Sequence, residues 1–324
     1  MKESKGDIRF GIFLKEDNFR LVEIENSQDH QHRINKIIQA KTDIAFDLNS
    51  INNDQQVIQI GEQIKDIVEV FHLQVRNAVF SMECPFALIK KIPIDANFSQ
   101  GDVIDQIDWE VEKFSYSPDD EYIVDFQKLE KTVTAGVQQM VVVAVREKII
   151  QQLRKMFRAA RLSVNVIDVD IFSAARALEA NYELKADETI ALTDIDENGI
   201  KITIIKDKEF YHYRELAGGK LQVERASLKF ADENEIVNIL SKELKSLVVD
   251  VDIGDSVESL QRIFLYGNYV KDGFLENMQN SFNVRIDKIN PFRKLYIAPK
   301  VSVDEKIWSH PEMFTICVGS ALHQ

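Results

Sequence analysis

Two Asp-x-Asp pairs stand at the ends of apolar, strand-like segments, where carboxylates can do chemistry. A carboxylate can act as a covalent nucleophile, and such a pair is typical of enzymes that transfer a phosphoryl group through aspartate. The fifth position of that motif usually holds Thr or Val, but this chain has phenylalanine or asparagine there. We keep this enzyme class only as an alternative that the spacing does not favour. The residues concerned are Asp168, Asp170 and Phe172 in one segment, and Asp194, Asp196 and Asn198 in the other.

The segment from Asp194 to Gly199 also has the acidic spacing of the first half of a calcium-binding loop. Such a loop needs a bidentate acid at its twelfth position, and this position is Ile205. β-Branched residues flank the segment on both sides, and its Asn-Gly pair favours a tight turn. We therefore predict a turn between two strands here, and no metal site.

The histidines and cysteines form no catalytic or metal-binding motif. His30 and His32 are the only close pair of histidines, and their polar surroundings predict two solvated side chains. Cys84 and Cys317 are far apart in the chain and are predicted to lie in the core. We expect no catalytic residue and no metal.

The hydrophobic pattern predicts alternating strands and helices in both halves of the chain. Each half opens with two β-rich segments parted by a polar turn, and this similarity predicts a duplicated α/β fold with two lobes. Predicted strands are 8–14, 19–24, 75–80, 140–145, 164–169, 190–195, 200–205, 210–216 and 263–266. Predicted helices are 57–71, 149–160, 171–184, 234–249 and 270–282.

Composition narrows the class of partner. The chain has 324 residues, and its 53 acidic and 40 basic residues give a formal net charge of −13. This charge disfavours a broad nucleic-acid or anionic-membrane surface. We find no apolar stretch long enough for a membrane span, and the two cysteines are too few for a secreted disulfide framework. We expect a cytoplasmic protein.

A series of short segments, in their order over some three hundred residues, resembles the type IV pilus assembly protein PilM family, a relative of the cell-division protein FtsA within the actin-like ATPase superfamily. The segments that carry the resemblance are Gly11-Ile12, Val22–Ile24, Val79–Ser81, Ile92–Ile94, Ile107–Glu110, Asp125-Phe126, Val142–Val145, Val166–Asp168, Asp194, Tyr213–Gly219, Phe264–Gly267 and Asn290–Phe292.

The resemblance implies an actin-like (ribonuclease H-like) α/β fold with duplicated halves and an inserted subdomain. By this reading, residues 1–87 and 163–186 form subdomain 1A, and 88–162 form the inserted subdomain 1C. Residues 187–324 form the second lobe, in which subdomain 2B, around 220–250, is reduced.

The family's phosphate and nucleotide positions are altered at several places in this chain. Lys15 replaces a glycine of the first phosphate loop, and Phe13 replaces its acid. The resemblance carries over four remnant nucleotide positions, Asp194, Gly218, Gly219 and Gly267, but Asp196 and Ile200 replace a glycine and a threonine, and Asn268 and Tyr269 replace a second glycine and a small residue.

We therefore expect no cofactor and a non-catalytic, actin-like scaffold, a pseudo-ATPase, in a type IV pilus or type II secretion-like machine. The resemblance implies a partner: the short cytoplasmic tail of an inner-membrane assembly protein, bound between 1A and 1C, and we place it against Val75–Phe80 and 88–94. The alternative is an ATP-binding platform or filament protein that still holds ATP and Mg²⁺ with Lys15 and the four remnant positions. Self-association is left open.

Overall fold

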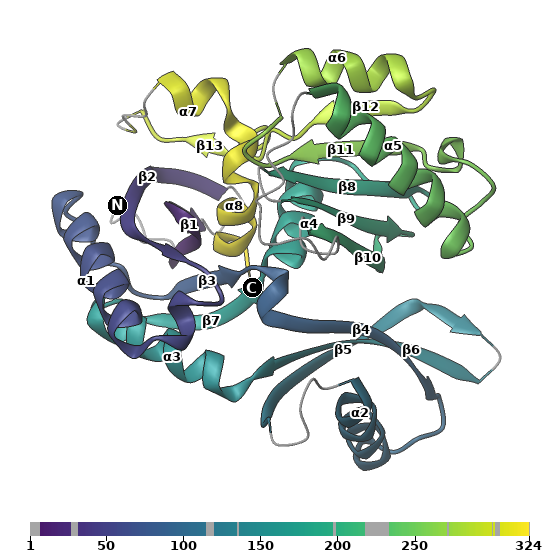
Figure 1. Cartoon of the computed structure of the whole chain (residues 1–324), viewed down its shortest axis with the longest axis horizontal. Coiled ribbons are helices and arrows are strands. Elements are labelled where there is room, and N and C mark those ends of the chain that lie inside the picture. Colours follow the sequence, from purple (N-terminus) through teal and green to yellow (C-terminus); the bar gives the residue numbers. More distant parts are fainter. Residues whose placement is uncertain are drawn as a thin grey trace, which may run out of the picture. The chain divides into compact units, whose positions relative to one another are not determined.

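The computed structural model describes residues 7–26, 32–114, 120–134, 136–196, 199–217, 233–270, 272–299, 301 and 305–323 (Figure 1). The chain divides into two compact units, which we describe separately. Unit 1 comprises Met1–Ala180, Phe292–Glu305 and Ile316–Gln324, and unit 2 comprises Asn181–Pro291 and Lys306–Thr315.

The centre of unit 1 is a five-stranded sheet in the order β13-β2-β1-β3-β7. The residues Phe10 to Phe13 of β1 pair in parallel with β3, and its later residues pair antiparallel with β2. Glu16, in the predicted turn, has a φ of 51° and lies where the register with β2 shifts. The strands are β1 (Asp7–Asn26), β2 (His32–Phe46), β3 (Ala78–Met82), β7 (Val164–Val169) and β13 (Tyr296–Ile297).

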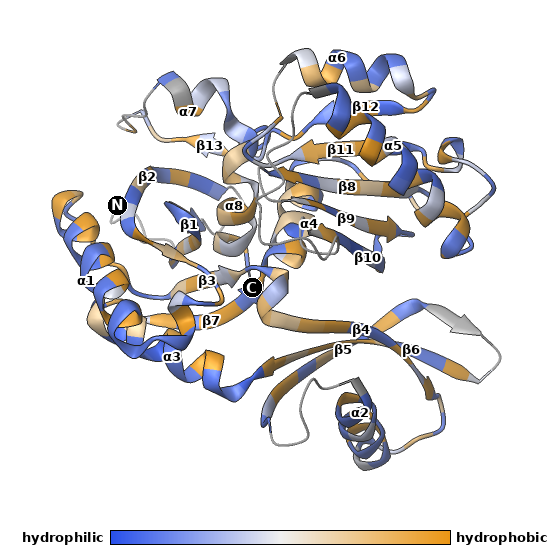
Figure 2. Cartoon of the chain, viewed as in Figure 1, coloured by the Kyte–Doolittle hydropathy of each residue, from blue (hydrophilic) through white to orange (hydrophobic). Residues whose placement is uncertain are grey.

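Helices with apolar faces cover this sheet (Figure 2). Helix α1 starts at Asn53, whose side chain accepts hydrogen bonds from the backbone N–H groups of Gln55 and Gln56. Helix α3 packs on α1 with a buried apolar face. The helices of unit 1 are α1 (Asp54–Val70), α3 (Glu147–Ala159), α4 (Asp170–Asn181), most of α8 (Thr315–Ala321), and the short η1 (Ser50–Asn52) and η2 (Cys84–Phe86).

A smaller antiparallel sheet, in the order β4-β6-β5, also belongs to unit 1. Side chains alternate between its two faces. One face packs on helix α2 through a core that includes Ile92, Ile107 and Val142, while Ile123, Asp125 and Val143 lie on the other face. The elements are β4 (Ala87–Asp95), α2 (Gln100–Phe114), β5 (Tyr122–Thr134) and β6 (Val137–Arg146).

Unit 2 holds a second five-stranded sheet, in the order β10-β9-β8-β11-β12. Strand β8 is buried along its whole length and pairs in parallel with β11 and antiparallel with β9. The strands are β8 (Thr189–Asp196), β9 (Gly199–Lys206), β10 (Glu209–Ala217), β11 (Arg262–Tyr266) and β12 (Arg285–Lys288). The helices are α5 (Glu233–Asp250), η3 (Val257–Ser259), α6 (Asp272–Ser281), α7 (Glu305–Ser309) and η4 (Pro311–Phe314).

The two larger sheets share one plan, which supports the predicted duplication. In each, the first strand pairs in parallel with an inner strand, which pairs in parallel with an edge strand, and antiparallel pairing continues on the other side. The predicted strands of the second half are confirmed as β8 to β11, and the predicted helices as α5 and α6. Glu197 and Asn198 of the predicted turn lie outside the described residues, and Gly199 begins β9.

The C-terminal segment behaves differently from the prediction, which assigned all of 187–324 to the second lobe. Strand β13 pairs with β2, and α8 lies directly against β1, so both belong with unit 1. A Cβ on Gly11 would overlap the backbone carbonyl of Cys317, so only glycine allows α8 to approach β1 this closely. Neither contact leaves a local signal in residues 290–324. Helix α3 packs on α1, although 88–162 was assigned to one inserted subdomain.

Candidate functional site

The first phosphate-loop position lies in unit 1, and its replacement side chains have partners inside the protein. Phe13 is buried in the core. The Lys15 ammonium lies 3.2 Å from the Glu83 carboxylate, and both side chains are largely buried. A buried lysine whose charge is already matched gains less from a phosphate than a free one does.

The second phosphate-loop position lies on β8 in unit 2. The Asp194 carboxylate is 3.4 Å from the ammonium of Lys201, its cross-strand partner on β9, and the two side chains are 3% and 7% exposed. The carboxylate is therefore already paired with a protein cation.

Two other residues that differ from the family pattern are hydrogen-bonded to each other. The Asn268 side chain donates hydrogen bonds to the Asp196 carboxylate, at 3.3 and 3.5 Å, although 72 residues separate them. Both residues stand where the family has glycine.

Gly267 lies beside this pair and has a φ of +109°. A Cβ there would overlap Asp194 and the backbone of Ile195. This glycine is thus required by the local backbone, whatever binds nearby.

The structure brings together two of the four predicted remnant positions, Asp194 and Gly267. Gly218 and Gly219 lie outside the described residues. Lys15 belongs to unit 1 and the other positions to unit 2. In the described part of the chain, no three His, Cys, Asp or Glu side chains gather as a metal site.

The other Asp-x-Asp pair also has internal partners. Asp168 accepts hydrogen bonds from Ser173 Oγ at 2.6 Å and Arg176 Nη1 at 2.9 Å. The Cys84 thiol donates to the fully buried Asp170 carboxylate at 2.7 Å. These contacts position the start of α4. Cys84 and Cys317 are both buried, as predicted, and burial raises the pKa of the Cys317 thiol to about 12.

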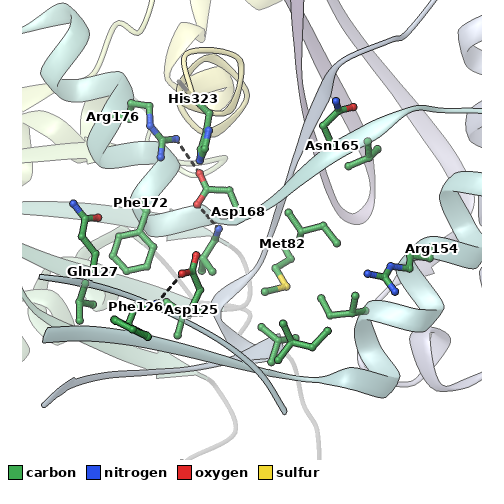
Figure 3. A pocket seen from close by; sticks show the side chains of 18 of the residues that line it. Met82, Asp125, Phe126, Gln127, Arg154, Asn165, Asp168, Phe172, Arg176 and His323 are labelled. Carbon is green, nitrogen blue, oxygen red and sulfur yellow. Dashed lines mark hydrogen bonds and ion pairs between the residues drawn. The ribbon is translucent and has the colours of Figure 1, made fainter. Parts of the chain in front are cut away.

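A pocket of about 650 Å³ lies within unit 1, between the two sheets and α3 (Figure 3). We call it the unit 1 pocket. Most of its lining is apolar, and most of the apolar side chains come from the free face of the small sheet, from β7 and from α3. These lining residues are Met82, Ile123, Phe126, Val141, Val143, Val145, Ile150, Phe157, Val164, Ile167, Val169 and Phe172.

Two strands line this pocket and also stand at sheet edges. Strand β7 ends the order β13-β2-β1-β3-β7, and β5 ends the order β4-β6-β5. Among the described residues, neither strand has a partner on its outer side. An edge strand presents unpaired N–H and C=O groups that can pair with an added extended peptide.

Charged groups stand at different places around the pocket (Figure 3). Arg176 is paired with Asp168 and also donates to the carbonyl of Gly319. Asp125 on β5 accepts a hydrogen bond from the Phe126 backbone, and Arg154 stands on α3. Among the described residues, neither Asp125 nor Arg154 has an ion-pair partner. The pocket thus offers one acid and one base that a ligand can engage.

Sequence reasoning placed a binding groove against Val75–Phe80 and 88–94, and no residue of either segment lines this pocket. It missed Ile123, Arg154 and Arg176. A signal for the first was present: residues 122–127 alternate in side-chain type, with Ile123, Asp125 and Gln127 on one face. The contribution of α3 had no such signal, because helix packing depends on distant segments.

The family model for type IV pilus assembly protein PilM matches residues 11–236, which is more than two thirds of the chain. The chain belongs to the PilM family. The matched range includes β1 from Gly11 onward, the unit 1 pocket lining up to Arg176, and β8 to β10. No curated protein matches the sequence.

Solved structures support the fold of this PilM family member. A "PilM-PilN type IV pilus biogenesis complex" chain is similar with a TM-score of 0.79 and 17% identity, covering 99% of this chain and 98% of that chain. The actin-like ATPase fold predicted from the sequence is therefore confirmed.

Two further structures are similar at a lower level. One is a Bacteroides thetaiotaomicron protein with an actin-like ATPase fold, at 11% identity, 89% and 92% coverage and a TM-score of 0.49. The other is the cytoplasmic domain of EpsL, from the type II secretion system of Vibrio cholerae, at 9% identity, 98% and 95% coverage and a TM-score of 0.49.

Proposed function

We propose that this PilM family protein is a non-catalytic scaffold of a type IV pilus or type II secretion-like assembly machine. It binds the short cytoplasmic tail of an inner-membrane partner in the unit 1 pocket, and this binding holds it at the cytoplasmic face of the membrane. No helix among the described residues is long and apolar enough to cross a membrane itself.

The observation that carries this proposal is the pocket's combination of apolar lining and open strand edges. Val141, Val143 and Val145 form an apolar row on β6, and the edges of β5 and β7 lie on the same pocket. A short extended peptide can bury apolar side chains on such a row while its backbone pairs with an edge strand. The similar structure named as a PilM-PilN complex supports a protein partner for the fold.

The absence of ATP turnover is proposed from the two phosphate-loop positions. Lys15 is paired with Glu83, Asp194 with Lys201, and Asn268 with Asp196. A nucleotide would have to displace these contacts before its phosphates and Mg²⁺ could be bound. The mutual satisfaction of these side chains favours a structural role for both positions.

Peptide titration tests the binding role. The ligand is a synthetic peptide of the cytoplasmic tail of the inner-membrane protein encoded beside this gene. Ile123→Asp places a charge on an exposed pocket side chain, and we expect it to weaken binding tenfold or more, because an apolar contact worth about 1.5–3 kcal/mol is lost. Val249→Asp, at an exposed position of α5 in unit 2, is the matched control and should bind as the native protein does. Equal loss in both variants, or no binding by the native protein, would contradict the proposal.

Calorimetric titration with Mg-ATP tests the alternative, an ATP-binding platform or filament protein. We expect no binding in the micromolar range. If the native protein binds Mg-ATP in the micromolar range and Asp194→Ala abolishes this binding, the alternative is established and the proposed non-catalytic role is wrong.

A further inference from the structure

A basic stripe runs along α3 of unit 1. Arg154 and Arg158 are four residues apart, so they lie on one face of the helix, and Arg161 follows just beyond its end. All three are exposed. They stand out in a chain whose formal net charge is −13. We call these three residues the α3 stripe.

The stripe connects two pockets of unit 1. Arg154 lines the unit 1 pocket, and Arg161 lines a second pocket of about 380 Å³. This second pocket also contains Lys65, Arg76 and Glu69. A polypeptide that leaves the first pocket over α3 would therefore meet positive charge along its whole path.

Neighbouring acids neutralise only part of this charge. Glu69 lies 4.0 Å from Arg161 and 3.9 Å from Lys65, so one carboxylate is shared by two cations. The Asp54 carboxylate lies 2.9 Å from the ammonium of Lys155, which is another residue of α3. In the described part of the chain, Arg154 and Arg158 have neither an ion pair nor a hydrogen bond. The two arginines nearest the unit 1 pocket thus remain available to a ligand.

We propose that the α3 stripe binds an acidic segment of the same partner, contiguous with the tail in the unit 1 pocket; this inference rests on the proposed function. Arginine binds carboxylates with a planar pair of donors, so glutamates or aspartates fit it well. A flat lipid surface fits less well, because Arg154, at one end of the stripe, lines a concave pocket. Asp125, which also lines the pocket but lacks a cation, would repel an acidic segment there, so the acidic segment leaves over α3.

Three synthetic peptides test this inference on the full-length protein. All contain the tail of the inner-membrane protein encoded beside this gene; one has three glutamates added after it, one has them before it, and one has three glutamines after it. We expect one glutamate peptide to bind about tenfold more tightly than the glutamine peptide at low salt, as three exposed ion pairs would give. The gain should shrink as salt is raised, because the charges are exposed.

A double variant, Arg158→Gln/Arg161→Gln, leaves Arg154 of the unit 1 pocket unchanged. It should lose most of the gain and keep the affinity for the glutamine peptide. Lys242→Gln/Lys245→Gln, which removes two exposed charges from α5 of unit 2, should keep the gain. A glutamine peptide that binds while neither glutamate peptide gains would overturn this inference alone. If no peptide binds, the proposed function fails and the inference falls with it. Vesicles of phosphatidylglycerol that bind through the two arginines, without any peptide gain, would assign the stripe to lipid and overturn it as well.

Discussion

The unit 1 pocket and the Asp194 region of unit 2 both contain charged side chains, but only those of the Asp194 region are paired within the protein. In the pocket, Asp125 and Arg154 have no ion-pair partner among the described residues, and the apolar row of β6 lines the cavity. On β8, the Asp194 carboxylate is buried against Lys201, and Gly267 leaves no room for another atom. The charged groups of the pocket are available to a ligand, whereas the Asp194 carboxylate already has a partner within the protein.

This difference supports the binding role that we propose for the unit 1 pocket. A charged group that is buried and paired costs free energy to expose, whereas an exposed one costs little to engage. The family resemblance alone would direct attention to the nucleotide positions. The contacts direct it to the pocket.

The largest expected effect on stability comes from removing the cation that pairs with Asp194. Lys201→Met leaves the Asp194 carboxylate buried without its cation, and we expect it to lower the free energy of unfolding by about 3–5 kcal/mol. Denaturant titration measures this value. Adding Asp194→Asn to the variant removes the stranded charge and should recover much of the loss. A loss below about 1 kcal/mol would mean that Asp194 is solvated and the region open.

The second effect separates structural from ligand-binding reasons for a retained glycine. Gly267→Ala forces a side chain into a left-handed conformation and against Asp194, and we expect a loss of about 2–4 kcal/mol in unfolding free energy. Gly101→Ala is the control, since it lies in the first turn of α2 with open space around it. It should be neutral or slightly stabilising. Equal stability of both variants would remove the packing argument for Gly267.

The third effect compares two ligands on the native protein. A tail peptide at one hundred times its dissociation constant should stabilise the fold by about 2.7 kcal/mol, because it binds only the native state. Thermal unfolding with and without peptide gives this shift. Millimolar Mg-ATP should leave the midpoint unchanged. The reverse result would exchange the roles of the two regions.

The smallest effect on stability is expected for a substitution in the unit 1 pocket. Ile123→Asp should change the unfolding free energy by less than about 0.5 kcal/mol, because this side chain is 42% exposed. Its effect on peptide binding should nevertheless be large. A stability loss comparable with that of Lys201→Met would show that the pocket face is part of the core.

Much of the fold follows from local pattern. The spacing of Val57, Ile60 and Ile64 predicts α1, and the alternation across the Asn-Gly turn predicts β8 and β9; both are confirmed. Strands β2, β4, β5, β12 and β13 and helices α2, α7 and α8 were not predicted. Strand β13 and helices α7 and α8 have few residues, and their packing partners stand near the other end of the chain or in another element, so no periodicity develops.

The candidate site is less predictable. The replacement of two phosphate-loop residues by Phe13 and Lys15 is visible in the sequence, and so is the substitution at Asp196. Their internal partners are not visible, because Lys15 meets Glu83 and Asp196 meets Asn268 across long chain separations. Without these partners, the same substitutions could equally describe an altered but open nucleotide site.

The sequence by itself determined the class of fold, the duplicated halves and the altered phosphate positions, since each depends on residue type and short-range spacing. Only the tertiary structure decided which charges are already paired and which are free. Pairing depends on the distance between side chains that folding brings together. The neighbouring residues in the sequence do not show that Asp194 pairs with Lys201 or that Arg154 lines a pocket.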